Sequence, residues 1–157
     1  MPYFPSKNYK QGIFNPQNKE KYKGKLPINY RSGLEFKFCM FCDCNRSIVE
    51  WGIESVIVPY IDESRNNTKH NYVVDFVLTV KDKDGKFTKF LVEVKPSKET
   101  VKPIRTARKT ETTLMNESLT FVRNQCKWKY ATAYAESKGM KFQIITEKDI
   151  NVSQQKR

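Results

Sequence analysis

The stretch from residue 72 to residue 95 reads YVVDFVLTVKDKDGKFTKFLVEVK, two apolar runs that flank a polar turn. Both runs are rich in β-branched and aromatic residues, the composition that favours β-strands. Asp75 interrupts the first run, and Glu93 and Lys95 lie at the end of the second. A charged side chain inside a buried strand loses hydration, which costs several kcal/mol unless a partner or a metal compensates. The three residues therefore require a common explanation.

The length of the turn decides whether Asp75 and Glu93 share a face of the predicted hairpin. A two-residue loop would direct the two carboxylates to opposite faces. A three-residue loop over residues 83–85, with Gly85 left-handed, places Asp75 opposite Glu93 with their Cβ atoms roughly 5 Å apart. Glycine in the last loop position favours this loop. Because side chains alternate along a strand, Lys95 then projects from the same face as Glu93.

Two carboxylates and a lysine at one strand end suit a hard divalent cation and an activated water. The alternative is a structural ion pair between Asp75 and Lys95, with Glu93 solvated at the end of its strand. An Asp followed at a distance by Glu-X-Lys is a weak pattern when taken alone. Its placement inside two apolar strands, joined by a loop of suitable length, favours the metal site.

These residues resemble the motif of the PD-(D/E)XK nuclease superfamily, an acidic residue on one strand followed by Glu-X-Lys on the next. Val74 departs from the proline in the superfamily's name, a position that is the least kept part of the motif. The resemblance implies that Asp75, Glu93 and the Val94 carbonyl hold Mg²⁺ or Mn²⁺. It also implies that Lys95 stabilises developing negative charge or helps to deprotonate the attacking water.

The superfamily usually has a further acid on an upstream helix, and Glu35 resembles it. Ser32 is a predicted N-cap for a helix from residue 33 to about residue 45, in which Glu35 takes the third position of a capping box. Capping and metal binding compete for this one carboxylate, and we favour metal binding. Glu54 is an alternative acid that only the resemblance indicates.

A broader resemblance, to the small head-completion nucleases of tailed phages, extends from residue 30 to residue 100. It is carried by YRS at 30–32 with Glu35, WGIE at 51–54, VPY at 58–60, Tyr72 with Asp75, and EVKP at 93–96 with ET at 99–100. The catalytic core is also similar to the endonuclease subunit of Tn7-type transposons. The resemblance implies a DNA endonuclease of the virion neck, present in the host cytoplasm during infection, with portal or neck proteins as partners. Two alternatives stay open: a non-catalytic neck protein that binds DNA, and an endonuclease subunit of a transposase or a repair system.

Composition agrees with a nucleic-acid partner. The 157 residues suit one domain, and 29 Lys and Arg against 17 Asp and Glu give a net charge of +12. We predict that DNA backbone is held by Arg31, Lys98, Lys102, Arg105 and Lys109. No apolar run approaches the ~20 residues of a membrane span, which predicts an intracellular protein without a membrane role. No phosphate-binding loop or nucleophile motif occurs, so no small-molecule cofactor is expected.

Along the chain we expect a basic arm at residues 1–28, a nuclease domain at 29–150 and a polar tail at 151–157. The predicted fold is α/β and restriction-endonuclease-like, a mixed sheet of about four strands with helices on both faces, because the strands are apolar on both sides. Strands are predicted at 49–61, 71–80, 88–95 and 141–145, a loop at 62–70, and helices at 33–45, 105–124 and 127–137. Cys39, Cys42 and Cys44 lack a matching pair for a zinc site, so Cys39 and Cys42 are expected to behave as small apolar groups on their helix.

Overall fold

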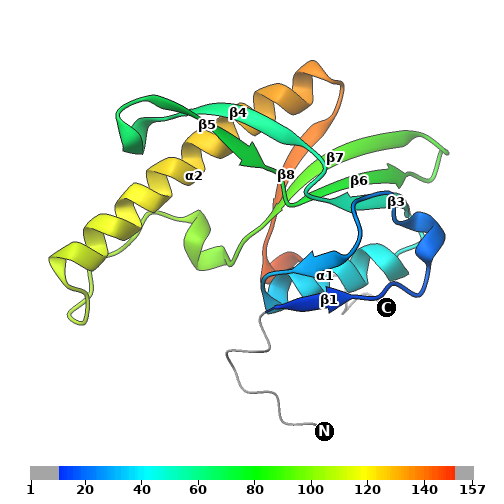
Figure 1. Ribbon diagram of the computed structural model, residues 1–157, viewed down its shortest axis with the longest axis horizontal. Helices are drawn as coiled ribbons and strands as arrows, with labels where there is room; N and C mark the ends of the chain where they lie inside the picture. The colour runs from blue at the N-terminus through cyan, green and yellow to red at the C-terminus, as the bar shows by residue number, and fades with distance from the viewer. Residues whose placement is uncertain (1–10, 151–157) are drawn as a thin grey trace, which may run out of the picture.

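A computed structural model describes residues 11–150, which form a mixed sheet with one helix on each face (Figure 1). The sheet has the strand order β3 (Ile48–Ile53), β6 (Phe76–Lys81), β7 (Phe87–Val94) and β8 (Lys141–Ile145). The first three strands are antiparallel neighbours, and β8 pairs with β7 in parallel. The predicted α/β class, with a mixed sheet of four strands and helices on both sides, is therefore confirmed.

The hairpin of β6 and β7 has the predicted register. The Asp82 N–H donates to the Lys86 carbonyl at 2.9 Å, and Gly85 has a left-handed φ of 79° in the three-residue loop between them. Phe76 pairs with Val92, so the same register continued by one position sets Asp75 opposite Glu93.

Two of the predicted strands are each divided by a bend. The predicted strand at 49–61 forms β3 and β4 (Ile57–Asp62), and the one at 71–80 forms β5 (Thr68–Val73) and β6. β5 begins inside the predicted loop, after the short 3₁₀ helix η2 (Glu63–Arg65). Since β3 pairs with β6 and β4 with β5, the four segments make one antiparallel ribbon that turns out of the sheet midway. Neither bend contains glycine or proline, so no residue in the sequence indicated a break at these positions.

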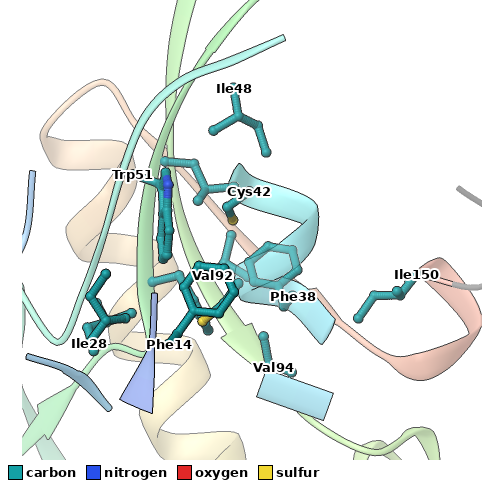
Figure 2. Close-up of a cluster of buried hydrophobic side chains, with 13 residues drawn as sticks. Phe14, Ile28, Phe38, Cys42, Ile48, Trp51, Val92, Val94 and Ile150 are labelled. Carbon is teal, nitrogen blue, oxygen red and sulfur yellow. The ribbon is translucent and has the colours of Figure 1, made fainter. Parts of the chain in front are cut away.

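α1 (Gly33–Cys44) packs on one face of the sheet. Its N-terminus is capped as predicted, because the Ser32 hydroxyl accepts a hydrogen bond from the Glu35 N–H at 3.0 Å. Phe38, Cys39 and Cys42 are buried and pack against strand residues such as Trp51 and Val92 (Figure 2). Cys39 and Cys42 thus serve as apolar core groups, and all four cysteines are free thiols.

α2 (Glu111–Ser137) is one helix where two were predicted. Residues 124–127 contain no helix breaker, so nothing in the sequence required the predicted interruption. The helix ends as expected at Gly139, whose φ is 69° and whose N–H donates to the Glu136 carbonyl. Cys126, Ala131 and Ala135 are buried in a second core on the opposite face of the sheet from α1, and the ribbon of β4 and β5 lies across this helix (Figure 1).

Residues 11–28 of the predicted arm pack onto this framework. β1 (Gly12–Phe14) pairs with β2 (Ile28–Tyr30), and η1 (Lys19–Lys21) lies between them in sequence. The Lys21 ammonium donates to the carbonyls of Cys42, Asp43 and Asn45 at 2.6–2.9 Å, so it neutralises the C-terminal end of α1. The rest of the predicted arm, residues 1–10, and the predicted tail at 151–157 lie outside the described residues. Among the described helices, none is both long and apolar enough to cross a membrane.

Candidate active site

The bend between β5 and β6 places Asp75 beside the end of β7. One carboxylate oxygen of Asp75 accepts a hydrogen bond from the Val94 N–H at 3.0 Å. The Asp75 carbonyl accepts another from the Glu54 N–H at 3.1 Å, across the matching bend between β3 and β4. The two bends therefore fix the Asp75 side chain at a strand end.

Glu93 is nearly buried and has a different partner on each carboxylate oxygen. The Tyr72 hydroxyl donates to one oxygen, and the Lys95 ammonium lies 3.6 Å from the other. Lys95 therefore projects from the same strand face as Glu93. About a quarter of its side chain is exposed, so the ammonium can also meet a group that arrives from solvent.

The two carboxylates repel each other in a poorly hydrated setting. Burial raises the pKa of Asp75 well above its usual value, and the negative charges of Glu93 and Glu35 raise it further. The Val94 N–H bond opposes this rise without cancelling it. Since Lys95 is the only cation paired with either Asp75 or Glu93 in the described part of the chain, negative charge is left over, and a divalent cation held by oxygen ligands would compensate it. Within residues 11–150, however, no three His, Cys, Asp or Glu side chains converge as ligands of one metal ion.

Glu35 caps the N-terminus of α1 and also lies near Asp75 and Glu93. Its carboxylate accepts a hydrogen bond from the Arg31 N–H at 2.9 Å, so it caps the entrance to α1. Burial raises the pKa of Glu35, and the nearby charges of Glu93 and Glu54 raise it too, while Arg31 lowers it. Glu35 thus lies close enough to the acidic group for its charge to raise the pKa of Asp75 and for Glu93 to raise its own.

Glu54 lies at the edge of the site, directly after β3 and next to Arg31, which precedes α1. Its φ of 48° is left-handed, a strained backbone conformation for a residue with a side chain, and it occurs at the bend that holds Asp75. Its carboxylate forms an ion pair with the Arg31 guanidinium at 3.0 Å. Arg31, predicted to bind DNA, is therefore at the edge of the acidic group, with most of its side chain exposed.

The other predicted DNA-binding residues differ in whether their charge is already paired with an acidic side chain. Lys98, on η3 (Ser97–Thr100), and Lys102 are exposed. Arg105 forms an ion pair with Glu111 at the start of α2. Lys109 donates to Glu117 at 2.7 Å and to the Ile104 carbonyl at 2.8 Å. The positive charge of this segment is thus partly neutralised by α2.

Sequence reasoning missed two residues of the site. Tyr72 belonged to the phage-nuclease resemblance, but its hydrogen bond to Glu93 follows from the bend and could not be read from spacing. The Lys127 ammonium, on α2, lies 5.5 Å from the centre of the Tyr72 ring. Burial lowers the pKa of Lys127, the negative charge of Glu93 opposes this, and the positive charges of Lys95, Arg123 and Arg65 add to it. No sequence signal distinguished Lys127 from the many other lysines.

The strand-end acids with an adjacent lysine, on a mixed sheet between two helices, define the class of this protein. Residues 45–147 match the family model described as the TnsA-like endonuclease N-terminal domain, and the chain belongs to this family of endonucleases. Over 140 residues it is also 38% identical to the head completion nuclease of Enterobacteria phage T4, covering 87% of this chain and 90% of the relative. Both comparisons confirm the resemblance predicted from the sequence.

Proposed function

We propose that this protein is a metal-dependent DNA endonuclease that acts in phage head completion, before the tail joins the filled head. The observation that carries the catalytic part is the pair of adjacent carboxylates, Asp75 and Glu93, whose charge Lys95 compensates only in part. The similarity to a head completion nuclease supports the biological setting. Mg²⁺ is the proposed metal, with Mn²⁺ as a substitute.

In the proposed mechanism Asp75, Glu93 and the Val94 carbonyl would hold the metal, and Glu35 would bind water molecules around it. When bound, the metal supplies Lewis-acid polarisation of the scissile phosphate and lowers the pKa of the attacking water. The Tyr72 hydroxyl and the Lys95 ammonium orient the Glu93 carboxylate, since each meets a different oxygen. As an ammonium, Lys95 would stabilise the negative charge that develops on the phosphate, and only as a neutral amine would it accept the proton of the water.

The proposed substrate is DNA at the portal of a filled head, and the proposed partners are portal or neck proteins in the virion. The surplus of positive charge supports a DNA partner. Of the predicted phosphate contacts, Lys98 and Lys102 are exposed, and so is most of the Arg31 side chain. Residues 11–28 are committed to the domain core and to capping α1, so a neck-protein contact made by the arm would use residues 1–10.

The test is cleavage of linear, branched and single-stranded DNA by the wild type and Asp75→Ala, each with Mg²⁺ and with a chelator. We expect cleavage only by the wild type with metal. Cleavage in the chelator, or full activity of the variant, would rule out the proposed mechanism. Deletion of the gene from its phage should leave filled heads that fail to join tails productively. Normal head–tail joining would leave the endonuclease and remove the head-completion role.

An endonuclease subunit of a transposase is the second candidate, because the family model that matches is named after such an enzyme. The phage deletion separates the two. A non-catalytic neck protein is separated from both by the cleavage assay, since it would bind DNA without cutting it.

A further inference from the structure

A fully buried aspartate, Asp62, lies at the end of β4, outside the candidate active site. The Asp62 carboxylate is fully buried and accepts hydrogen bonds from the Arg65 Nε at 2.6 Å and from the Arg123 Nε at 3.0 Å. The N–H and the hydroxyl of Ser64 donate to its other oxygen. One carboxylate therefore holds two guanidinium groups, one from η2 and one from α2.

This cluster has more positive charge than its carboxylate can neutralise. Both arginines approach Asp62 through Nε, and Arg65 also donates to the Tyr60 hydroxyl at 3.0 Å. Among the described residues Asp62 is the only partner of Arg123, so its two terminal nitrogens are left without a protein acceptor. About a third of the Arg123 side chain and two fifths of the Arg65 side chain are exposed. The guanidinium groups are thus fixed at one end and open to solvent at the other.

The cluster is connected to the candidate active site. Arg123 and Lys127 are four residues apart on α2, so they lie on one face, about 6 Å apart along the axis. The Lys127 ammonium lies over the Tyr72 ring, and the Tyr72 hydroxyl donates to Glu93. Lys127 therefore lies between the Glu93 end of the site and Arg123, and Asp62 joins Arg123 on α2 to Arg65 on η2.

We propose that Lys127, Arg123 and Arg65 form a phosphate-binding tract that holds the DNA strand along α2 as it leaves the active site. That the ligand is DNA rests on the proposed function. Asp62 is a positioning residue in this tract, since it orients two guanidinium groups whose free nitrogens match phosphate oxygens. A purely structural role would need only one cation for one carboxylate, as in the pair of Lys109 with Glu117. None of the three residues belongs to the basic segment after β7 that the sequence had suggested.

The experiment measures binding of a fluorescent duplex to the full chain by anisotropy, in a chelator, over a series of salt concentrations. Lys127→Gln should weaken binding by up to about eightfold at 0.1 M salt and lower the log–log salt slope by about 0.9, the loss of one phosphate contact. Lys129→Gln is the matched control, since Lys129 is an exposed lysine two residues further along α2 that lines the groove between α2 and β8. It should leave affinity and slope close to those of the wild type.

The sharper variant is the double substitution Asp62→Asn with Arg123→Gln, which leaves the net charge unchanged. If DNA senses only overall charge, this variant binds like the wild type. If the tract is real, the slope falls by about 0.9 despite the equal charge. Thermal melting checks that the double variant folds. If the double variant does not fold, the comparison of Lys127→Gln with Lys129→Gln tests the tract by itself.

The outcomes separate the tract from the proposed function. Unchanged binding by Lys127→Gln, or an equal loss with Lys129→Gln, overturns the tract even if the wild type cleaves DNA with Mg²⁺. If Lys127→Gln weakens DNA binding and the wild type cleaves no DNA, the tract is supported and the proposed endonuclease activity is rejected. A wild type that does not bind DNA removes both.

Discussion

Asp62, which is buried, and Asp75, which is partly buried, are two aspartates at the bends and ends of one β-ribbon, and their surroundings are opposite. Burial acts to raise the pKa of Asp62, but hydrogen bonds from Ser64, Arg65 and Arg123 outweigh it and hold the pKa well below its usual value. Asp75 has no paired cation among residues 11–150, so burial and the facing charge of Glu93 raise its pKa. The Asp62 carboxylate is thus fully paired within the protein and orients two guanidinium groups. The Asp75 carboxylate has no such partner among the described residues, so its charge could be compensated by a bound metal ion.

The largest expected effect concerns catalysis. Asp75→Ala, Glu93→Ala and Lys95→Ala should each lower the rate of Mg²⁺-dependent DNA cleavage by about 10³-fold or more while the fold survives. Asp62→Asn should weaken DNA binding only, so it should lower cleavage by less than about tenfold at subsaturating enzyme and leave the saturated rate close to that of the wild type. Single-turnover rates at saturating enzyme measure this difference. An equal loss for Asp62 and Asp75 would break the comparison.

The second expected effect is on stability. Asp62→Asn removes the partner of two arginines, and we expect a loss of about 2–3 kcal/mol in the free energy of unfolding, moderated because both arginines can regain water. Asp75→Asn removes a repelled charge and should stabilise the metal-free protein by about 1–3 kcal/mol at neutral pH. Urea denaturation of the two variants in a chelator should therefore give changes of opposite sign. Changes of the same sign would show that one of the two environments has been misinterpreted.

The third expected effect is the pH dependence of these changes. The raised pKa of Asp75 means that the folded state binds the proton more tightly, so the stability of the metal-free protein falls as pH rises from about 4 towards that raised pKa. The lowered pKa of Asp62 acts in the reverse direction: its contribution is present above about pH 4 and is lost as pH falls through the lowered value. Melting temperatures across this range should show the gain of Asp75→Asn shrinking towards acid pH.

Metal addition sharpens the same test. Mg²⁺ should raise the melting temperature of the wild type at neutral pH, and less at pH 5, because protons compete for the Asp75 carboxylate. It should leave the melting temperature of Asp75→Asn nearly unchanged. A wild type that does not respond to Mg²⁺ or Mn²⁺ would contradict the proposed metal site.

The smallest expected effect is a change in the salt dependence of DNA binding, and it tests whether the tract on α2 or the N-terminal arm supplies the DNA affinity. Deletion of residues 1–10 removes two lysines, Lys7 and Lys10, and should lower the log–log salt slope by at most about 1.8. Deletion of residues 1–25 is not an equivalent test, since it also removes β1 and the Lys21 cap of α1. If the shorter deletion flattens the slope completely, DNA binding resides in the arm and the tract on α2 contributes little.

Local chemistry explains which structural predictions the sequence allowed. Ser32 capped its helix, Gly85 closed its loop and Gly139 ended α2, because each depends on a backbone preference of one residue type. The single α2 and the bends at Glu54 and Asp75 were missed, because no residue there has a strong local preference. The left-handed Glu54 is imposed by the turn of the ribbon out of the sheet.

The sequence by itself determined the strand pair that contains Asp75, Glu93 and Lys95, since a period of two and one glycine turn fix which side chains share a face. Only the tertiary structure decided which cations meet which acids. Asp62 and Arg123 are separated by 61 positions in the chain, and they meet because the ribbon of β4 and β5 packs across α2. Burial and charge act over ångströms in space, so the difference between the satisfied Asp62 and the unsatisfied Asp75 arises only once the chain has folded.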